Sequence, residues 1–277
     1  MQHYPSAFSN LLIRDIKVKS DSALLAVTPM MYRIKFLLVS LIRPDTNEFE
    51  ELDLTVNEFI EYFELKSWGG NQYCALSDAI SMLKSFRYTV GDAEIVWLTE
   101  DSNADGQNIH LSLHESLAPF LLNLKRNFSK IYYENIKNLK SKYSLRLYEL
   151  LASMKGIGEL QLKLKAAYET ICDNNYISKS EFVTHVIDPA VEEINDCTDL
   201  NVTYRFEKSF GVPEKIIFKI GNATKSKGYK SPSTPPALKP ATLVSSVCVV
   251  DENYEIVDLY ESDHEIEETD VLDELPF

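Results

Sequence analysis

The sequence lacks several features that define whole classes of protein. Among its 277 residues no apolar run approaches the roughly 20 residues that span a bilayer, and the longest, Ile34–Ile42, is interrupted by Ser40. The N-terminus has no charged start followed by an apolar stretch, so we find no secretion signal. No two of the four cysteines form a CxxC pair, which argues against a zinc site or a redox motif. Scattered free thiols fit a reducing compartment, and we expect a cytoplasmic protein without membrane contact.

Motifs of catalysis and cofactor binding are also missing. The sequence has no GxxxxGK[ST] loop for nucleotide phosphates, no His-x-His pair of the kind that holds metal in DNA-nicking enzymes, and no Ser/His/Asp order. His110 and His114 stand four residues apart, a spacing of metal ligands on a helix, but His110 falls on a predicted strand. The sequence therefore favours a binding protein that is not an enzyme, with no cofactor and no metal.

Charge is distributed unevenly along the chain. The net charge is −14, but twelve of the 42 acidic residues lie in residues 251–277, which contain no Lys or Arg. Residues 125–165 hold ten Lys or Arg against three acidic residues. By its charge alone, such a basic run is as consistent with a solvated helix face as with a nucleic-acid-binding surface. Beside an acidic tail, it favours a nucleic-acid binder with a separate interaction or masking tail.

Residues 23–126 predict three helices followed by short strands. Thr28-Pro29 is typical of a helix N-cap and the first helical residue, and apolar residues then repeat with a helical period through Met30–Ile42. Thr55–Glu58 is a capping box that opens a second helix. A third helix and three β-rich runs are predicted at Gln72–Ser85, Tyr88–Val90, Ala93–Thr99 and Ile109–Leu113. Three helices followed by a hairpin is the order of a winged-helix domain.

The same order recurs over residues 127–221. A short strand is predicted at Leu160–Leu162, and a hairpin is predicted from Asn201–Phe206 and Lys215–Ile220. Helices are predicted at Tyr143–Met154, Lys163–Cys172 and Ser180–Asn195, the last kinked or restarted at Asp188-Pro189. We therefore predict an α+β fold with two tandem winged-helix domains.

The remaining segments predict no packed core. Residues 1–22 are assigned to an N-terminal arm. Residues 222–250 form a linker, rich in Lys, Ser and Pro between 224 and 240, that should stay extended. Residues 251–277 form an acidic tail that should be disordered because of its charge.

Three motifs in the same order carry a resemblance to a known family. Residues Asn127–Leu151 read NFSKIYYENIKNLKSKYSLRLYELL, residues Val186–Val191 read VIDPAV and are followed by Glu193-Ile194-Asn195, and residues Ile216–Ile220 close the region with IIFKI. These motifs strongly resemble the signature of replication initiators from iteron-containing plasmids. The resemblance extends over about residues 10–221.

The resemblance implies a bacterial, cytoplasmic DNA-binding protein. Its monomers would bind the direct repeats (iterons) of a plasmid origin, open the nearby duplex, and help the host replication initiator to load the replicative helicase. Its dimers, in equilibrium with monomers, would bind an inverted repeat and repress the initiator's own gene. Residues 23–126 would supply dimerisation and helper DNA contacts, and residues 127–221 the main DNA binding.

Helix periodicity separates the side chains that would face DNA from those that are buried. A recognition helix enters the major groove with its N-terminus first. Its predicted base-reading residues are Lys179, Ser180, Thr184, His185 and Asp188, the last accepting from a cytosine amino group. Phosphate anchoring is predicted for Lys140, Lys142, Arg146, Lys163, Lys165, Arg205, Lys208 and Lys215. Any one of these cations is as consistent with an ordinary surface charge, but as a set they favour DNA contact.

The end of the tail resembles a second kind of protein. Asp273, Glu274, Leu275, Pro276 and Phe277 are similar to the C-terminal tip of bacterial single-stranded-DNA-binding proteins. The likeness implies a host protein whose pocket takes Phe277 and the terminal carboxylate, while the acidic residues meet a basic rim. The alternative is a tail that only keeps the protein in solution.

Two other functions remain open at this point. A winged-helix transcriptional regulator without any role in origin opening would share the same fold. A protein-interaction adaptor would use its winged helices as a scaffold and its acidic tail as the binding segment, and it would not bind duplex DNA tightly at physiological salt.

Overall fold

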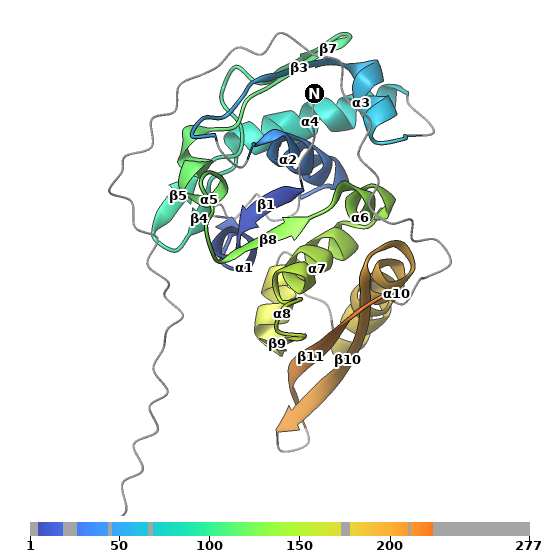
Figure 1. The fold of residues 1–277 in the computed structure, drawn as a ribbon. Coiled ribbons are helices and arrows are strands. Elements are labelled where there is room, and N and C mark those ends of the chain that lie inside the picture. Colours follow the sequence, from blue (N-terminus) through green and yellow to red (C-terminus); the bar gives the residue numbers. More distant parts are fainter. Residues whose placement is uncertain are drawn as a thin grey trace, which may run out of the picture.

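The computed structural model describes residues 5–18, 27–43, 46–65, 69–172, 178–209 and 212–223. These residues form two units of helices and short sheets, one above the other in Figure 1, with helix α7 (Lys142–Ser153) between them. The predicted α+β fold with two winged-helix domains is confirmed. The predicted linker from residue 224 onward and the acidic tail lie outside the described residues. None of the described helices is long and apolar enough to cross a membrane.

The helices of the first unit begin at the residues that local chemistry favours. Helix α2 (Pro29–Leu41) starts with Pro29, and the Thr28 hydroxyl accepts a hydrogen bond from the Met31 backbone N–H at 3.3 Å. Helix α3 (Val56–Tyr62) opens with the predicted capping box, in which the Glu58 carboxylate accepts from the Thr55 backbone N–H at 2.7 Å. Helix α4 (Gly70–Ser85) follows. The three helices predicted for this unit are confirmed.

Two small sheets complete the first unit. One has the order β2 (Lys17–Val18), β4 (Tyr88–Val90), β5 (Ala93–Ile95), and Gly91 makes the turn between the last two strands with φ of +57°. The other has the order β3 (Leu52–Thr55), β7 (Asn108–Leu111), β6 (Asn103–Asp105). The strands predicted to run to residues 99 and 113 end earlier, although Leu98 and Leu113 still form one bridge.

Histidine 110 links three parts of the second small sheet. Its Nδ1 lies 2.7 Å from Oδ1 of Asp53 on β3, and its Nε2 lies 3.4 Å from Oδ2 of Asp101. Each ring nitrogen thus has its own carboxylate partner, which differs from two side chains converging on one metal ion. Among the described residues no group of His, Cys, Asp and Glu is arranged to hold a metal.

Within the predicted N-terminal arm, residues 6–14 are packed into the fold. Strand β1 (Ser6–Ser9) pairs antiparallel with β8 (Phe128–Ile131), and Figure 1 shows the two strands side by side next to α7. Helix α1 (Asn10–Arg14) follows and contacts α7, where the Arg14 guanidinium donates to the Ser153 carbonyl at 2.6 Å. The boundary predicted between residues 126 and 127 therefore falls just before a strand that pairs with the N-terminal segment.

Helix α7 is buried on almost every side. Its buried residues include Leu147, Tyr148, Glu149 and Leu151, and it contacts β8, α1 and α2 of the first unit and α8 (Leu164–Ile171), β9 (Glu159–Lys163) and α10 (Asp188–Cys197) of the second. Short helices η1 (Glu115–Leu117), α5 (Ala118–Leu121) and α6 (Tyr133–Asn138) lead from the first unit towards it. One helix therefore serves as a core element of both units.

The second unit has the predicted helices and strands. After α7 come β9, α8, α9 (Lys179–Phe182), the π-helical turn η2 (Val183–Ile187) and α10. Strands β10 (Leu200–Ser209) and β11 (Val212–Asn222) form the long hairpin, and β9 pairs with β11 to give the order β10-β11-β9. This is the helix, strand, helix, helix, hairpin order of a winged-helix domain.

A partly buried polar network ties α6 and α7 to the start of β10. Oδ1 of Asp199 accepts from the Asn135 amide and from the Tyr148 hydroxyl, each at 3.0 Å. Oδ2 of Asp199 accepts from the Lys155 ammonium at 2.7 Å, and Asn135 also donates to the Tyr148 oxygen at 2.6 Å. Because the partners come from distant parts of the chain, this network fixes the second unit around α7.

Removing the hydroxyl from this network should destabilise the fold. We expect Tyr148→Phe to lower the free energy of unfolding by about 1–2 kcal/mol, because the buried Asn135 and the half-buried Asp199 each lose a partner. Urea unfolding followed by circular dichroism measures the change. The control is Tyr143→Phe on the same helix, whose half-buried ring contacts the Lys142 ammonium. Equal, small effects of the two substitutions would show that the network does not stabilise the fold.

The histidine link should make stability depend on pH. Burial alone would lower the pKa of His110, but hydrogen bonds to Asp53 and Asp101 and the charges of these carboxylates outweigh burial and raise it. Protonated His110 therefore stabilises the folded state. This stabilisation is complete below the pKa of His110 in the unfolded chain, about 6.5, and it is lost as the pH rises through the higher pKa of the folded state. We expect the unfolding midpoint of the wild type to fall more between pH 6 and pH 8 than that of His110→Gln. Parallel pH profiles would contradict this.

Candidate DNA interface

The third helix of the second unit presents a polar face to solvent. It begins at a capping box in which Ser178 accepts from the Glu181 backbone N–H and the Glu181 carboxylate accepts from that of Ser178. Its buried side is Phe182, Val186, Ile187, Ala190 and Ile194. Among the predicted base-reading residues, Ser180, Thr184, His185 and Asp188 are exposed and Lys179 is half-buried. The structure thus brings these five residues together on one helical segment.

A π-helical turn lies in the middle of this helix. The Asp188 backbone N–H donates to the carbonyl of Val183, five residues earlier, instead of four. Pro189 follows directly, and its ring would clash with the preceding turn of a regular α-helix. The kink or restart predicted at Asp188-Pro189 is therefore a widened turn in a continuous helix. Because a wider turn holds more residues, Ser180, Thr184 and Asp188 stay closer to one line along the exposed face than α-helical spacing alone would place them.

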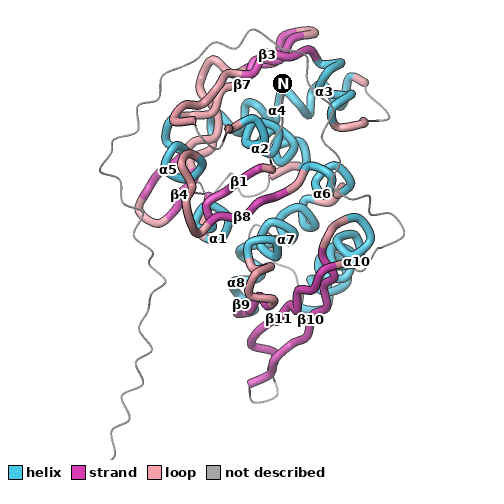
Figure 2. Tube along the Cα trace, in the orientation of Figure 1, coloured by secondary structure: helices cyan, strands magenta, loops and turns pink. Residues whose placement is uncertain are grey.

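The wing is the hairpin of β10 and β11, which extends past the helices in Figure 2. Along β10 the residues Leu200 and Val202 are buried, whereas Thr203, Arg205 and Glu207 are exposed, so every second residue faces away from the helices. Lys208 follows a bulge between Glu207 and Lys208 and is exposed. The predicted wing cations Arg205 and Lys208 are therefore available to solvent.

Two predicted cations stand next to each other on the outer face of this sheet. In the register of β11 and β9, Lys215 lies directly opposite Lys163. Like charges in this arrangement destabilise a sheet, so an anion between them would be favourable. Lys219 lies four pairs further along on the same face and is exposed, and it is not among the residues predicted from the sequence. Lys215 and Lys219 are an even number of residues apart on one strand, so the sequence pattern alone indicates that they share a face.

The remaining predicted phosphate contacts are spread over two other elements. Lys140 is exposed just before α7, and Lys142 on its first turn lies 5.3 Å from the centre of the Tyr143 ring. Lys165 on α8 is 90% exposed and pairs with Glu169 at 3.8 Å. An exposed pair of this kind contributes little and can open, so it leaves Lys165 available for another anion.

Arginine 146 does not lie on this surface, and its predicted role in phosphate binding needs correction. Its side chain is only 11% exposed. Its guanidinium donates to the carbonyls of Ile13 at 2.9 Å and Thr170 at 3.2 Å, and it lies 3.4 Å from the Glu149 carboxylate. The helical period placed Arg146 on a polar face of α7, but α1 and α8 cover that face. Arg146 is therefore a structural residue that joins α7 to both units.

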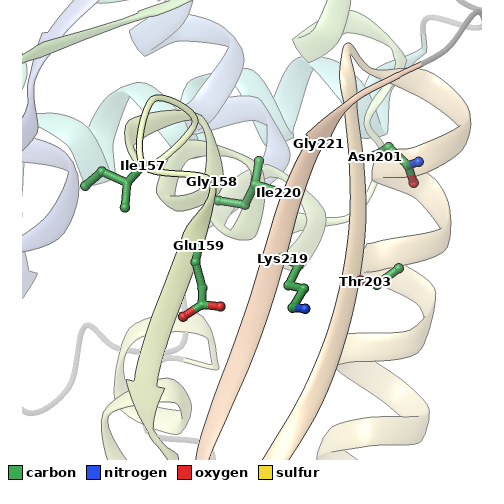
Figure 3. A pocket seen from close by; sticks show the side chains of 8 residues that line it. All are labelled: Ile157, Gly158, Glu159, Asn201, Thr203, Lys219, Ile220 and Gly221. Carbon is green, nitrogen blue, oxygen red and sulfur yellow. The ribbon is translucent and has the colours of Figure 1, made fainter.

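A shallow depression lies beside the wing, at the end of the sheet away from the tip. Figure 3 shows its lining, which includes Ile157, Gly158, Lys219 and Gly221, and its volume is 510 Å³. Ile157 is 70% exposed at its rim. The lining offers Glu159, Asn201 and Thr203 as polar groups but no nucleophile paired with a base.

Two family profiles match the chain. The profile described as "Initiator Replication protein, WH1" matches residues 17–152, and the profile described as "Initiator Rep protein, WH2" matches residues 163–220. Together they cover more than half of the chain, and the first match ends within α7.

One similar solved structure is described as SeMet derivatives of domain 2 and domain 3 of RctB. The identity is 12% and the TM-score is 0.44, over 70% of this chain and 80% of that chain. We draw no functional argument from a likeness this low.

The geometry separates the exposed cations predicted to bind phosphate from the covered Arg146, and the salt dependence of DNA binding should show the difference. We expect Lys163→Ala and Lys208→Ala each to lower the slope of log affinity against log salt by about 0.9, because each residue is predicted to contact one phosphate. Arg146→Ala should leave the slope unchanged but lower the free energy of unfolding by about 3 kcal/mol, because it removes one of the two cations beside the buried Glu149 and the donor to the Ile13 and Thr170 carbonyls. Titrations of a duplex at several salt concentrations, with parallel urea unfolding, measure both quantities. If Arg146→Ala changes the slope of log affinity against log salt without any loss of stability, Arg146 contacts DNA after all.

Proposed function

We propose a function from the premise that this chain belongs to the initiator replication protein family, whose two winged-helix domains it matches in order. It acts as a plasmid replication initiator that binds duplex DNA sequence-specifically. The observation that carries this proposal is the second unit, where a helix with an exposed polar face stands beside a wing bearing Arg205, Lys208 and Lys215. A polar helix supplies base readout and wing cations supply phosphate contacts.

The work of such a protein is done by binding rather than by catalysis, and we propose that it is not an enzyme. Its monomers bind direct repeats in the origin, favour opening of nearby duplex, and present the host replication initiator and the replicative helicase to the opened strand. Its dimers, formed through the first unit, bind an inverted repeat and repress its own gene. It acts in the bacterial cytoplasm, where the plasmid is copied. These finer roles rest on the family and on the arrangement of two DNA-binding folds in one chain.

A footprint of the full-length protein on the DNA upstream of its own gene tests this function. We expect protection of tandem direct repeats at low protein concentration, and of an inverted repeat at higher concentration where dimers form. Protection of a lone palindrome would favour a transcriptional regulator instead. No specific protection at physiological salt would favour an interaction adaptor. A duplex with the repeats scrambled is the control.

The acidic tail is proposed to have two separable roles, and both concern residues outside the described part of the chain. The twelve negative charges of residues 251–277 follow an extended linker that includes residues 224–240. A linker of this length lets them reach the basic surface and compete with DNA phosphates. Each such exposed contact contributes about 0–1 kcal/mol and is screened by salt. Removing all residues after Lys239 should therefore raise DNA affinity at low salt and much less at high salt. A salt-independent gain in affinity would contradict this masking role.

The tip of the tail is proposed to recruit a host protein. Removing Pro276 and Phe277 leaves all twelve acidic residues, so DNA affinity should stay unchanged while binding to a host replication or repair protein is lost. Affinity capture with the full-length chain and with the shortened chain, followed by identification of the bound proteins, measures the difference. Identical captured proteins and equal plasmid copy number would show that the tip has no partner.

A further inference from the structure

The third helix of the second unit is joined to the wing strand β10 at three points. The Lys179 ammonium lies 4.4 Å from the centre of the Phe206 ring, and the Tyr204 hydroxyl donates to Oδ1 of Asp188 at 2.5 Å. Further along, the Asn195 side chain accepts from the Val202 backbone N–H at 2.6 Å and donates to the Val202 carbonyl at 2.9 Å. Residues 202, 204 and 206 alternate along β10, so they share the face that meets the helix.

These three contacts differ in what they can do for DNA binding. The Asn195 amide satisfies the backbone of an edge strand, which closes that edge to other chains. Lys179 and Phe206 make a cation–π contact that leaves the charge on the surface. The Asp188–Tyr204 pair lies between the other two contacts. Asp188 belongs to the exposed face of the helix, together with Ser180 and Thr184.

The Asp188–Tyr204 bond has a defined direction. Burial, the bond to Asp188 and the charge of its carboxylate raise the pKa of Tyr204 to about 12, so the phenol keeps its proton and donates. A hydroxyl that donates to a carboxylate makes a charge-assisted bond, which is stronger and more directional than a neutral one. The Tyr204 ring is itself held by Phe206 and Phe218, whose centres lie 5.8 and 6.1 Å away. Asp188 is therefore fixed to a rigid part of the wing.

We propose that Tyr204 is a positioning residue, which holds Asp188 and so fixes the recognition helix against the wing before DNA arrives. The proposal rests on the DNA-binding function proposed above. It gives Asp188 a second role beside the predicted contact with a cytosine amino group, because its Oδ1 accepts from Tyr204. Holding the helix and the wing in one arrangement removes an ordering cost from binding, so base contacts from Thr184 and His185 form together with phosphate contacts from the wing.

The test uses the full-length chain and two duplexes. One carries a site that the wild-type protein selects from a pool of random 20-base-pair duplexes, and the other carries the same bases scrambled. Tyr204→Phe removes the hydroxyl and keeps the ring, Asp188→Ala removes the acceptor, and Asp188→Asn keeps an acceptor oxygen. The matched control is Asp196→Ala, an exposed carboxylate on the same helix.

We expect Tyr204→Phe and Asp188→Ala each to weaken binding to the selected site by about tenfold, the size of one charge-assisted hydrogen bond. The double substitution should be no weaker than either single one, because both remove the same contact. Asp188→Asn keeps a neutral bond to the Tyr204 hydroxyl, so it should weaken binding less than Asp188→Ala does. Asp196→Ala should not weaken binding to either duplex.

Hydroxyl-radical footprints and repeated selections separate positioning from base reading. Under the proposal, Tyr204→Phe keeps protection of the backbone at the wing side of the site, weakens it under the helix, and selects the same bases. If Asp188→Ala changes the preferred base at one position while Tyr204→Phe changes nothing, Asp188 reads a base and the proposal is wrong. Equal losses on both duplexes that follow a fall in thermal stability would also overturn it. A wild type that selects no sequence overturns the proposed function itself.

Discussion

The arrangement of the two units depends on one buried carboxylate, that of Glu149 in the middle of α7. Its two oxygens lie 3.4 Å from the Arg146 guanidinium and 4.0 Å from the Lys35 ammonium. Lys35 also lies 4.4 Å from the centre of the Tyr32 ring and 4.7 Å from that of Trp97, inside the first unit. A buried charge without a partner costs several kcal/mol, so each of these groups requires the others in place. The charges therefore specify how α7 sits in the first unit.

Arg146 extends the same constraint to the second unit. Burial lowers the pKa of Lys35, and the negative charge of Glu149 opposes that shift. Arg146 stands on the other side of Glu149 and donates to carbonyls of α1 and α8. On another side of α7, the Tyr148 hydroxyl donates to Asp199 at the start of the wing. A buried ion pair is weak evidence for net stability but does define geometry, and here it defines how one winged helix stands against the other.

Local chemistry in the sequence predicted the elements well, because caps, turns and periodicity act within a few residues. The Thr55–Glu58 capping box and the Pro29 helix start lie where expected. Contacts between distant residues were beyond such reasoning. Arg146 has the sequence pattern of a surface cation, and only its bond to Ile13, 133 residues away, shows that it is covered. The pairing of β1 with β8 also joins residues far apart in the sequence, and the pattern of neither strand indicates which strand it pairs with.

The exposed face of the recognition helix is itself short of positive charge. Asp188, Glu192 and Asp196 are exposed along it, whereas Lys179, the one Lys or Arg among residues 178–197, contacts the Phe206 ring of the wing. Phosphate attraction supplies most of the affinity of a DNA-binding protein, so this helix cannot hold DNA by charge. The cations predicted to do so lie on the wing, on α8 and at the start of α7, and salt screens their effect over about 8 Å. Under the proposed function, anchoring and reading are thus separated in space, and a helix that repels phosphate enters the groove only when the wing holds it there. The same proposal makes the bonds between helix and wing a condition of recognition, because they hold the base-reading helix to the phosphate-binding wing.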